Sequence, residues 1–285
     1  MRQIGAGLFA GTDEVIHGVF GLKEREHLKQ WTTCLEVAGR RVSADALIEL
    51  VRQLYRSVSD KLGNHKPSAE NWWKPQIRIQ DRNNSPEIVL ERAVALLAMR
   101  GCMDEWCNQI PVASGLIDHK LDKRAAVDLA RIEGDRLDLY ELKWKSDTPI
   151  HAAFEILRYG LAYLLCRANP KLGYANHRTM KVTALGLNVV APRRYYKDFD
   201  LAWLQAGLDV GIRTVSQEQL GRPEFRASFQ FLALPEELSV EPTGLFATGA
   251  KAKEACGATP LAPKAVALAQ AMSKLVPVFP ARDPL

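Results

Sequence analysis

The chain has 285 residues, of which 47% are hydrophobic and 25% charged, and its formal net charge is +5. This length allows one medium-sized domain with a substantial core and appended segments. The small positive charge permits a polyanionic partner such as nucleic acid without requiring one. Apolar runs are too short for a membrane span, and acidic residues near the start do not fit a signal peptide. We therefore expect a soluble, cytoplasmic protein with no membrane partner.

Residues 1–84 are predicted to form a separate, mostly helical module. Its clearest helix begins after Ser43, a favourable N-cap residue, and ends before Gly63. One face of this helix carries apolar residues at helical spacing, namely Leu47, Leu50, Val51, Leu54, Tyr55, Val58 and Leu62. The polar stretch that follows contains Trp72 and Trp73. We interpret both as packing residues, and the alternative is that they stack on nucleic-acid bases.

The next predicted helix spans residues 85–101. Its Ser-Pro start and its glycine end are favourable N-terminal and C-terminal signals. Nearly every side of the helix is apolar, so it should be buried, yet Glu87 and Glu91 lie on one edge of it. A buried acid needs a partner. The simplest partner is an arginine, such as Arg92 or Arg131.

No cysteine or histidine pattern indicates a metal site. The five cysteines are scattered and include no CxxC pair, which disfavours a zinc knuckle and a disulfide framework. Asp118 and His119 lie in a polar loop that follows a strand predicted within residues 107–114. We interpret that loop as solvated.

Residues 125–145 are predicted to form two strands joined by a tight turn. Gly134-Asp135 is a two-residue loop with glycine first, as a type II′ hairpin turn prefers. The turn sets the register, because it pairs Glu133 with Arg136. Residues that face each other across an antiparallel pair project from the same face of the sheet.

This register places Asp128 directly opposite Glu141, with Lys143 on the same face. Two carboxylates held so close repel each other. A divalent cation would offset the repulsion, with Asp128, Glu141 and the Leu142 carbonyl as oxygen ligands. Lys143 would then hold a water or a phosphate. The alternative is a surface salt-bridge ladder of the same three charged residues.

Another helix should start at Thr148-Pro149 and end near residue 169. Its core face carries Ile150, Ala153, Phe154, Leu157, Leu161, Leu164 and Leu165. A strongly apolar strand is predicted over residues 181–192, then a helix near 200–207 and a last strand over 226–234.

A basic loop follows the strand that ends at residue 192. It contains Arg193, Arg194 and Lys197, interleaved with Tyr195 and Tyr196. Such a composition suits a loop that tracks a phosphate backbone. The alternative is a solvated basic turn. Beyond residue 238 the chain becomes rich in Ala, Gly, Thr and Pro, which is typical of a linker, and a short helix follows whose small apolar face could dock on this protein or on a partner.

Asp128, followed by Glu141-Leu142-Lys143 and then by an amphipathic helix, resembles the motif of the PD-(D/E)XK phosphodiesterase superfamily. That superfamily includes restriction endonucleases, Holliday-junction resolvases and defence nucleases. The resemblance extends to the order of predicted elements over residues 85–234. It implies an α/β fold with a restriction-endonuclease-like core, in which helices flank a mixed central sheet. The expected organisation is a helical module over 1–84, a nuclease-like core over 85–238, and a flexible linker with a short helix over 239–285.

The resemblance also implies a site. Asp128, Glu141 and Lys143 would be the catalytic residues, and Asp128 and Glu141 would bind a metal together with a glutamate of the first core helix. Glu91 is the first choice for that glutamate and Glu87 the second. A ligand set of carboxylates favours Mg²⁺ or Mn²⁺.

Many nucleases of the superfamily carry a Gln-x-x-x-Tyr pair on the next helix, and Glu155 and Tyr159 take those places here, with Glu replacing Gln. Glu155 would either orient Lys143 or form a surface ion pair with Arg158. The implied activity is metal-dependent cleavage of nucleic acid, DNA more than RNA, in bacterial defence or mobile-element biology. Protein partners could bind the N-terminal module or the C-terminal helix. The alternatives are a catalytically silent nucleic-acid-binding or scaffold subunit on the same fold, and an unrelated α/β protein with an exposed Glu141–Lys143 ion pair.

Overall fold

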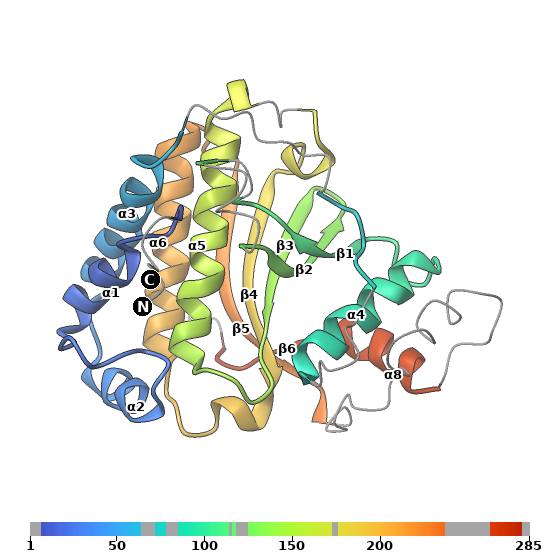
Figure 1. Ribbon diagram of the computed structural model, residues 1–285, viewed down its shortest axis with the longest axis horizontal. Coiled ribbons are helices and arrows are strands. Elements are labelled where there is room, and N and C mark those ends of the chain that lie inside the picture. Colours follow the sequence, from blue (N-terminus) through green and yellow to red (C-terminus); the bar gives the residue numbers. More distant parts are fainter. Residues whose placement is uncertain are drawn as a thin grey trace.

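A computed structural model describes residues 7–63, 72–77, 85–113, 116–117, 125–172, 176–236 and 263–280. These residues form an α/β fold in which helices flank one mixed sheet (Figure 1). Asp118, His119 and the predicted linker lie outside the described residues. No helix in the described ranges is long and apolar enough to cross a membrane.

The strands of this sheet lie side by side in chain order. They are β1 (Trp106–Ile110), β2 (Val127–Glu133), β3 (Arg136–Leu142), β4 (Ala184–Pro192), β5 (Arg226–Leu234) and β6 (Val276–Pro277). The first three form an antiparallel meander, β4 and β5 run parallel to β3, and β6 is antiparallel to β5. The carboxyl ends of β3, β4 and β5 therefore meet at one edge of the sheet.

Two long helices cover one face of the sheet. Helix α5 (Pro149–Ala168) connects β3 to β4, and α6 (Ala202–Leu220) connects β4 to β5. Gly160 allows close packing here, because a Cβ at this position would lie 2.5 Å from Leu187 on β4. Short 3₁₀ turns η3 (Pro170–Leu172), η4 (Arg178–Met180) and η5 (Arg193–Tyr196) lie in the connections.

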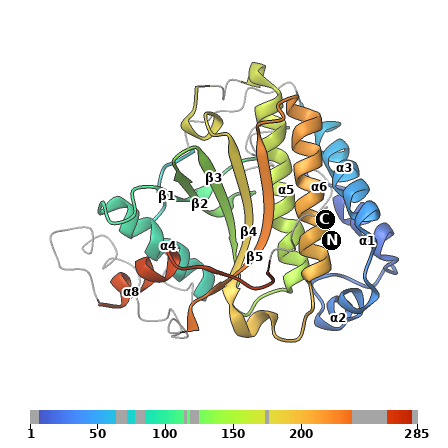
Figure 2. The same ribbon diagram turned by 180° about the vertical axis from the view of Figure 1, so that it is seen from behind.

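The N-terminal helices lie outside α5 and α6 (Figures 1 and 2). They are α1 (Thr12–Phe20), α2 (Trp31–Arg40) and α3 (Ala44–Ser59). The predicted apolar stripe of α3 is buried up to Val58 in the same hydrophobic core as α5 and α6, and Leu62 lies beyond the helix and is partly buried. The Ser43 hydroxyl caps α3 by accepting from the Ala46 N–H at 3.2 Å. Trp72 is also buried in this core, as the packing interpretation predicts.

A second core lies on the opposite face of the sheet, beneath α4 (Pro86–Met99) and α8 (Pro263–Met272). Figure 2 shows these two helices together, well away from α5 and α6. Leu268 and Met272 of α8 are buried in this core. The apolar face of the C-terminal helix therefore docks within this protein.

Most element predictions are confirmed in type, and several differ from the structure in extent. The hairpin strands are shorter than the predicted residues 125–145, since they span Val127–Glu133 and Arg136–Leu142. Helix α6 extends to Leu220, far beyond the predicted end near residue 207, because its buried residues continue along the whole helix. Strand β4 begins at Ala184 rather than at 181, and β1 begins at Trp106, one residue before the range within which it was predicted. The short strand β6 was not predicted, since it consists of only two residues that pair with β5.

Candidate active site

The hairpin of β2 and β3 has the predicted register. Glu133 pairs with Arg136, and the pairing continues in step to Leu129 opposite Tyr140. Gly134 has φ 58° at the turn, a conformation that glycine adopts without strain. The next step of the same register places Asp128 opposite Glu141. The Oδ2 atom of Asp128 accepts a hydrogen bond from the Leu142 N–H at 2.9 Å, which fixes this carboxylate at the end of β3.

Glu141 and Lys143 are buried, with only 4% and 7% of their surfaces exposed. They share the α5 face of the sheet with Leu139, which packs in the core beneath that helix. The Lys143 Nζ lies 2.8 Å from the Glu141 Oε1. A surface salt-bridge ladder is therefore excluded, because these two charges are removed from solvent.

Helix α5 brings a second carboxylate to Lys143. The Thr148 hydroxyl caps the helix by accepting from the His151 N–H at 3.3 Å. Two turns into the helix, the Glu155 Oε2 lies 3.0 Å from the Lys143 Nζ. Arg158 pairs with Asp13 instead. Of the two predicted contacts of Glu155, the one with Lys143 is thus the one that forms.

Glu91 reaches the edge of the meander from α4. Its side chain is 2% exposed, and its two oxygens accept from the Asn108 amide at 2.5 Å and from the Gln109 amide at 3.1 Å. Arg92 also lies 3.1 Å from Glu91, so the predicted arginine pair is present as well. Gln109 has φ 52°, and in the β1–β2 register it lies opposite Asp128. Such strained backbone is concentrated at functional sites in proteins.

Glu87 has a different role from Glu91. Its Oε1 accepts hydrogen bonds from the Trp144 N–H at 2.9 Å and from the Ser146 hydroxyl at 2.8 Å, and its Oε2 accepts from the Ser85 hydroxyl at 2.6 Å. Burial would raise the pKa of Glu87, but these hydrogen bonds outweigh burial and lower the pKa to about 2. This carboxylate therefore anchors the loop after β3, and its charge also raises the pKa of Asp128. Glu91 is the other helix acid that interacts with Asp128, and its own hydrogen bonds go to β1 rather than to this loop.

The nearby positive charges do not fully compensate the acids at this edge of the sheet, and the pKa values of these acids are raised. Burial, reinforced by the charge of Asp128, raises the pKa of Glu91 to about 8 despite Arg92. Burial also raises the pKa of Asp128 to about 6, although the Leu142 N–H and Lys143 oppose it. The pKa of Glu141 lies well above its usual value because of burial and of the nearby Asp128 and Glu155 charges.

Lys143 stays protonated in this setting. Burial alone would lower its pKa, but the Glu141 and Glu155 carboxylates outweigh burial and raise it. The same two acids, together with burial, raise the pKa of the Tyr159 hydroxyl, so this predicted outer residue lies in the field of the cluster. An ammonium held in its charged form is suited to stabilising negative charge and poorly suited to accepting a proton.

The raised pKa values predict an unusual dependence of stability on pH. An acid whose pKa is higher in the folded state binds more protons there, so stability falls as pH rises. For Glu91 the loss runs from about pH 4.5 to about pH 8. Between pH 5 and 8, in EDTA, we expect the wild type to lose on the order of 2–4 kcal/mol relative to Glu91→Gln. Urea unfolding of both proteins at several pH values measures this difference, and parallel curves would contradict it.

A further cluster lies beside Lys143. One ligand atom from each of Asp147, His151 and Glu155 can be chosen so that all three lie within 4.8 Å of one another, and no other His, Cys, Asp and Glu trio of the described residues meets this criterion. The carboxylate oxygens of Asp128, Glu141 and Glu91 are thus farther apart than the ligand atoms of this trio. The Lys143 Nζ lies 3.7 Å from the Asp147 Oδ2 and also contacts Glu155. The lysine ammonium therefore already offsets the negative charge of this cluster.

Sequence reasoning missed Asp147 and His151. Their signal was the spacing of four residues between Asp147, His151 and Glu155, although helical spacing accounts only for His151 and Glu155, which share one side of α5. Asp147 itself precedes α5 and has φ 56°, a conformation that no sequence pattern predicted.

The basic loop lies at the same edge of the sheet. Turn η5 follows the carboxyl end of β4, beside the end of β3 that carries Lys143. Arg193, Arg194 and Lys197 are exposed, as a phosphate-tracking loop requires. Its two tyrosines, Tyr195 and Tyr196, are only 6% and 3% exposed. They pack in the core, so neither ring is exposed to stack on a nucleic-acid base.

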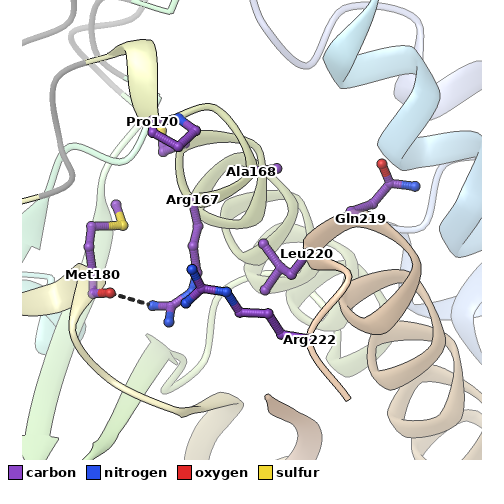
Figure 3. Close-up of a pocket in the computed structure, with 8 residues that line it drawn as sticks. Arg167, Ala168, Pro170, Met180, Gln219, Leu220 and Arg222 are labelled. Carbon is purple, nitrogen blue, oxygen red and sulfur yellow. Dashed lines mark hydrogen bonds between the residues drawn. The ribbon is translucent and has the colours of Figure 1, made fainter. Parts of the chain in front are cut away.

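A cavity of about 350 Å³ lies far from these acids, at the carboxyl ends of α5 and α6. Arg167 and Arg222 line it, and Figure 3 shows Arg167 donating to the Met180 carbonyl, at 2.9 Å. Its described lining contains no carboxylate. We therefore place the candidate chemistry at the acid cluster.

Comparisons of the chain with protein-family models, with curated proteins and with solved structures find no match. The functional assignment therefore depends on the residues and the geometry given above. The arrangement offers buried carboxylates for a cation, a charged lysine for an anion, and exposed basic residues at the same edge.

Proposed function

We propose that this protein is a divalent-metal-dependent nuclease with a restriction-endonuclease-like core, which hydrolyses phosphodiester bonds of nucleic acid, DNA more than RNA. The observation that carries the proposal is the set of half-buried Asp128 and buried Glu141 and Lys143 at the end of one hairpin. Two further acids approach this set from separate helices, Glu91 from α4 and Glu155 from α5.

The order of elements supports the proposed core. Helix α4, the β1–β2–β3 meander, helix α5 and the parallel strand β4 follow one another as in the superfamily that the motif resembles. Asp128 lies on the second strand of the meander, and Glu141 and Lys143 lie at the end of the third. These positions of the motif residues support the proposed core.

The donor set fits a hard divalent cation. One oxygen of Asp128 accepts from the Leu142 N–H and one oxygen of Glu141 contacts Lys143. The other oxygen of each carboxylate has no hydrogen-bond partner within the described part of the chain. Oxygen ligands favour Mg²⁺ or Mn²⁺ over Zn²⁺. Asp128 and Glu141 would hold the cation, and Glu91 would join them once its amide and arginine contacts rearrange.

The protein's own residues then account for binding and charge stabilisation. A bound cation would polarise the scissile phosphodiester and activate a water molecule for attack. Lys143 would contact the phosphate oxygens and stabilise the negative charge that develops on them. Glu155 and Glu141 keep this lysine charged and point its ammonium group, because both carboxylates lie within 3.0 Å of the Nζ.

The basic loop would hold the nucleic-acid backbone beside this site. Changing Arg193, Arg194 and Lys197 together to alanine should weaken binding to unrelated sequences alike. The slope of log K against log salt should become shallower by about 0.9 per lost contact on duplex, or about 0.7 on a single strand. Cleavage at saturating substrate should change little, because the loop positions the backbone. Titrations at several salt concentrations measure the slope, and a wild-type affinity with a wild-type slope would remove the loop from the interface.

The activity itself is tested by incubating the purified protein with plasmid, linear duplex, single-stranded DNA and RNA. Each substrate is offered with Mg²⁺, with Mn²⁺ or with EDTA. We expect cleavage of at least one DNA substrate that depends on the metal and stops in EDTA. Binding without cleavage under every condition would instead identify a catalytically silent nucleic-acid-binding subunit.

A further inference from the structure

A small cavity adjoins the candidate active site on the side of the N-terminal helices. It has a volume of about 110 Å³ and lies between α1, the segment that leads to α2, and the first half of α5. Its polar lining consists of Asp13, His17, His27, Lys29, His151 and Arg158. Five of these six side chains carry nitrogen donors, and only one carries a carboxylate.

The single carboxylate of the lining is already neutralised. Asp13 forms an ion pair with the terminal nitrogen of Arg158. The Nε of Arg158 is buried and has no hydrogen-bond partner among the described residues. A buried donor without an acceptor is costly, so this N–H is suited to donate to an oxygen of a ligand.

Two imidazoles face each other across the cavity region. The rings of His17 and His27 have their centroids 5.8 Å apart, and no hydrogen bond of either ring is found in the described part of the chain. Both rings are thus available as donors to an anion. His27 is exposed and His17 half-buried, so a ligand can enter from solvent.

The cavity is connected to Lys143 by two short chains of contacts. Lys29 lines the cavity, and its Nζ lies 3.6 Å from Asp147, which in turn lies 3.7 Å from the Lys143 Nζ. His151 lines it as well, with its Nε2 3.8 Å from the Glu155 carboxylate that contacts Lys143. An anion in the cavity would therefore be linked to the lysine proposed to contact the scissile phosphate through two residues on each path, Lys29 and Asp147 or His151 and Glu155.

We propose that this cavity binds a phosphate group of the substrate next to the scissile one, with His17, His27, Lys29 and Arg158 as its donors. The inference deepens the proposed nuclease function and rests on it for the identity of the substrate. The phosphate would be either a terminal monoester or an internal diester of the same strand. In both cases the N-terminal helices contribute directly to the choice of substrate.

Phosphate binding is tested without metal and without cleavage. Inorganic phosphate is titrated into the full-length protein in EDTA while the imidazole signals are followed by ¹H–¹⁵N NMR. We expect the signals of His17 and His27 to shift, and the double variant H17A/H27A to bind phosphate about tenfold more weakly or worse. Lys29→Gln should weaken phosphate binding as well. Because Lys29 is exposed, this variant tests the cavity even if the double variant does not fold.

Arg222→Ala is the matched control. It removes an exposed positive charge from the cavity at the other end of α5, and phosphate binding should stay unchanged. Unshifted imidazole signals, or equal phosphate affinity in wild type and in the His and Lys variants, would overturn the inference even if the protein proves to be a nuclease.

The source of the phosphate is read from cleavage of one oligonucleotide with a 5′-phosphate, a 3′-phosphate or hydroxyl ends, and of its circular form. A preference of about tenfold or more for one phosphorylated end, lost in H17A/H27A, assigns the cavity to a terminal phosphate. Equal cleavage of linear and circular forms, together with histidine-dependent phosphate binding, assigns it to an internal phosphate. Absence of cleavage for every substrate would contradict the proposed nuclease function. The NMR titration would then still show whether the cavity binds phosphate.

Discussion

Replacing Lys143 with alanine is expected to lower metal-dependent cleavage by at least about 10²–10³-fold, as loss of a preorganised charge that stabilises a transition state does. The ammonium lies between Glu141 and Glu155, and no other cation of the described residues contacts both carboxylates. Binding of nucleic acid should change far less, because the exposed loop would supply most of the phosphate contacts. Single-turnover cleavage and binding titrations of the same variant separate the two effects.

Two further variants test the assignment of Lys143. Lys143→Arg should not restore cleavage, because the broad, planar guanidinium does not fit a position where the ammonium is 7% exposed between two acids. Lys181→Ala is the control, since it removes an exposed lysine from the opposite edge of the sheet. Cleavage by Lys143→Ala at the rate of Lys181→Ala would exclude Lys143 from the mechanism.

The second large effect is expected from the two hairpin acids. Asp128→Asn and Glu141→Gln should each abolish measurable metal binding and lower cleavage by at least about 10³-fold, because each replaces a charged carboxylate that would hold the cation with a neutral amide. In EDTA the same variants should be more stable than the wild type, because each removes one member of a repelling buried pair. Calorimetric Mn²⁺ titration and urea unfolding measure the two quantities.

Glu133→Gln is the matched control for these variants. It changes an exposed acid of the same hairpin, far from the cluster, and should leave metal binding and stability close to wild type. If Glu141→Gln binds Mn²⁺ as tightly as Glu133→Gln does, the cation must lie elsewhere.

The hairpin could be predicted because its register depends on local chemistry. Gly134-Asp135 favours one turn, and that turn pairs Asp128 with Glu141 without any information from the rest of the chain. The starts of the helices at Pro86 and Pro149 could be predicted equally well, since the signals that begin a helix are local in the sequence.

The surroundings of the hairpin could not be predicted in this way. The contact of Glu155 with Lys143 depends on how α5 packs on the sheet, and Asp147 joins them only through a left-handed backbone conformation. Glu87 was a weaker candidate for the metal site, and its binding of the loop after β3 is a tertiary contact with no sequence signal. Strand patterns likewise gave no sign of the positive φ at Gln109, which brings that amide to Glu91.

The most direct measurement of the central claim is the position of Mn²⁺ in crystals of the protein soaked with MnCl₂, located by anomalous scattering. We predict one peak that bridges the Oδ1 of Asp128 and the Oε2 of Glu141, at ligand distances of about 2.0–2.6 Å. The side chain of Glu91 should have turned toward it. A peak held by Asp147, His151 and Glu155 with Asp128 uninvolved, or no peak at saturating Mn²⁺, would contradict the account.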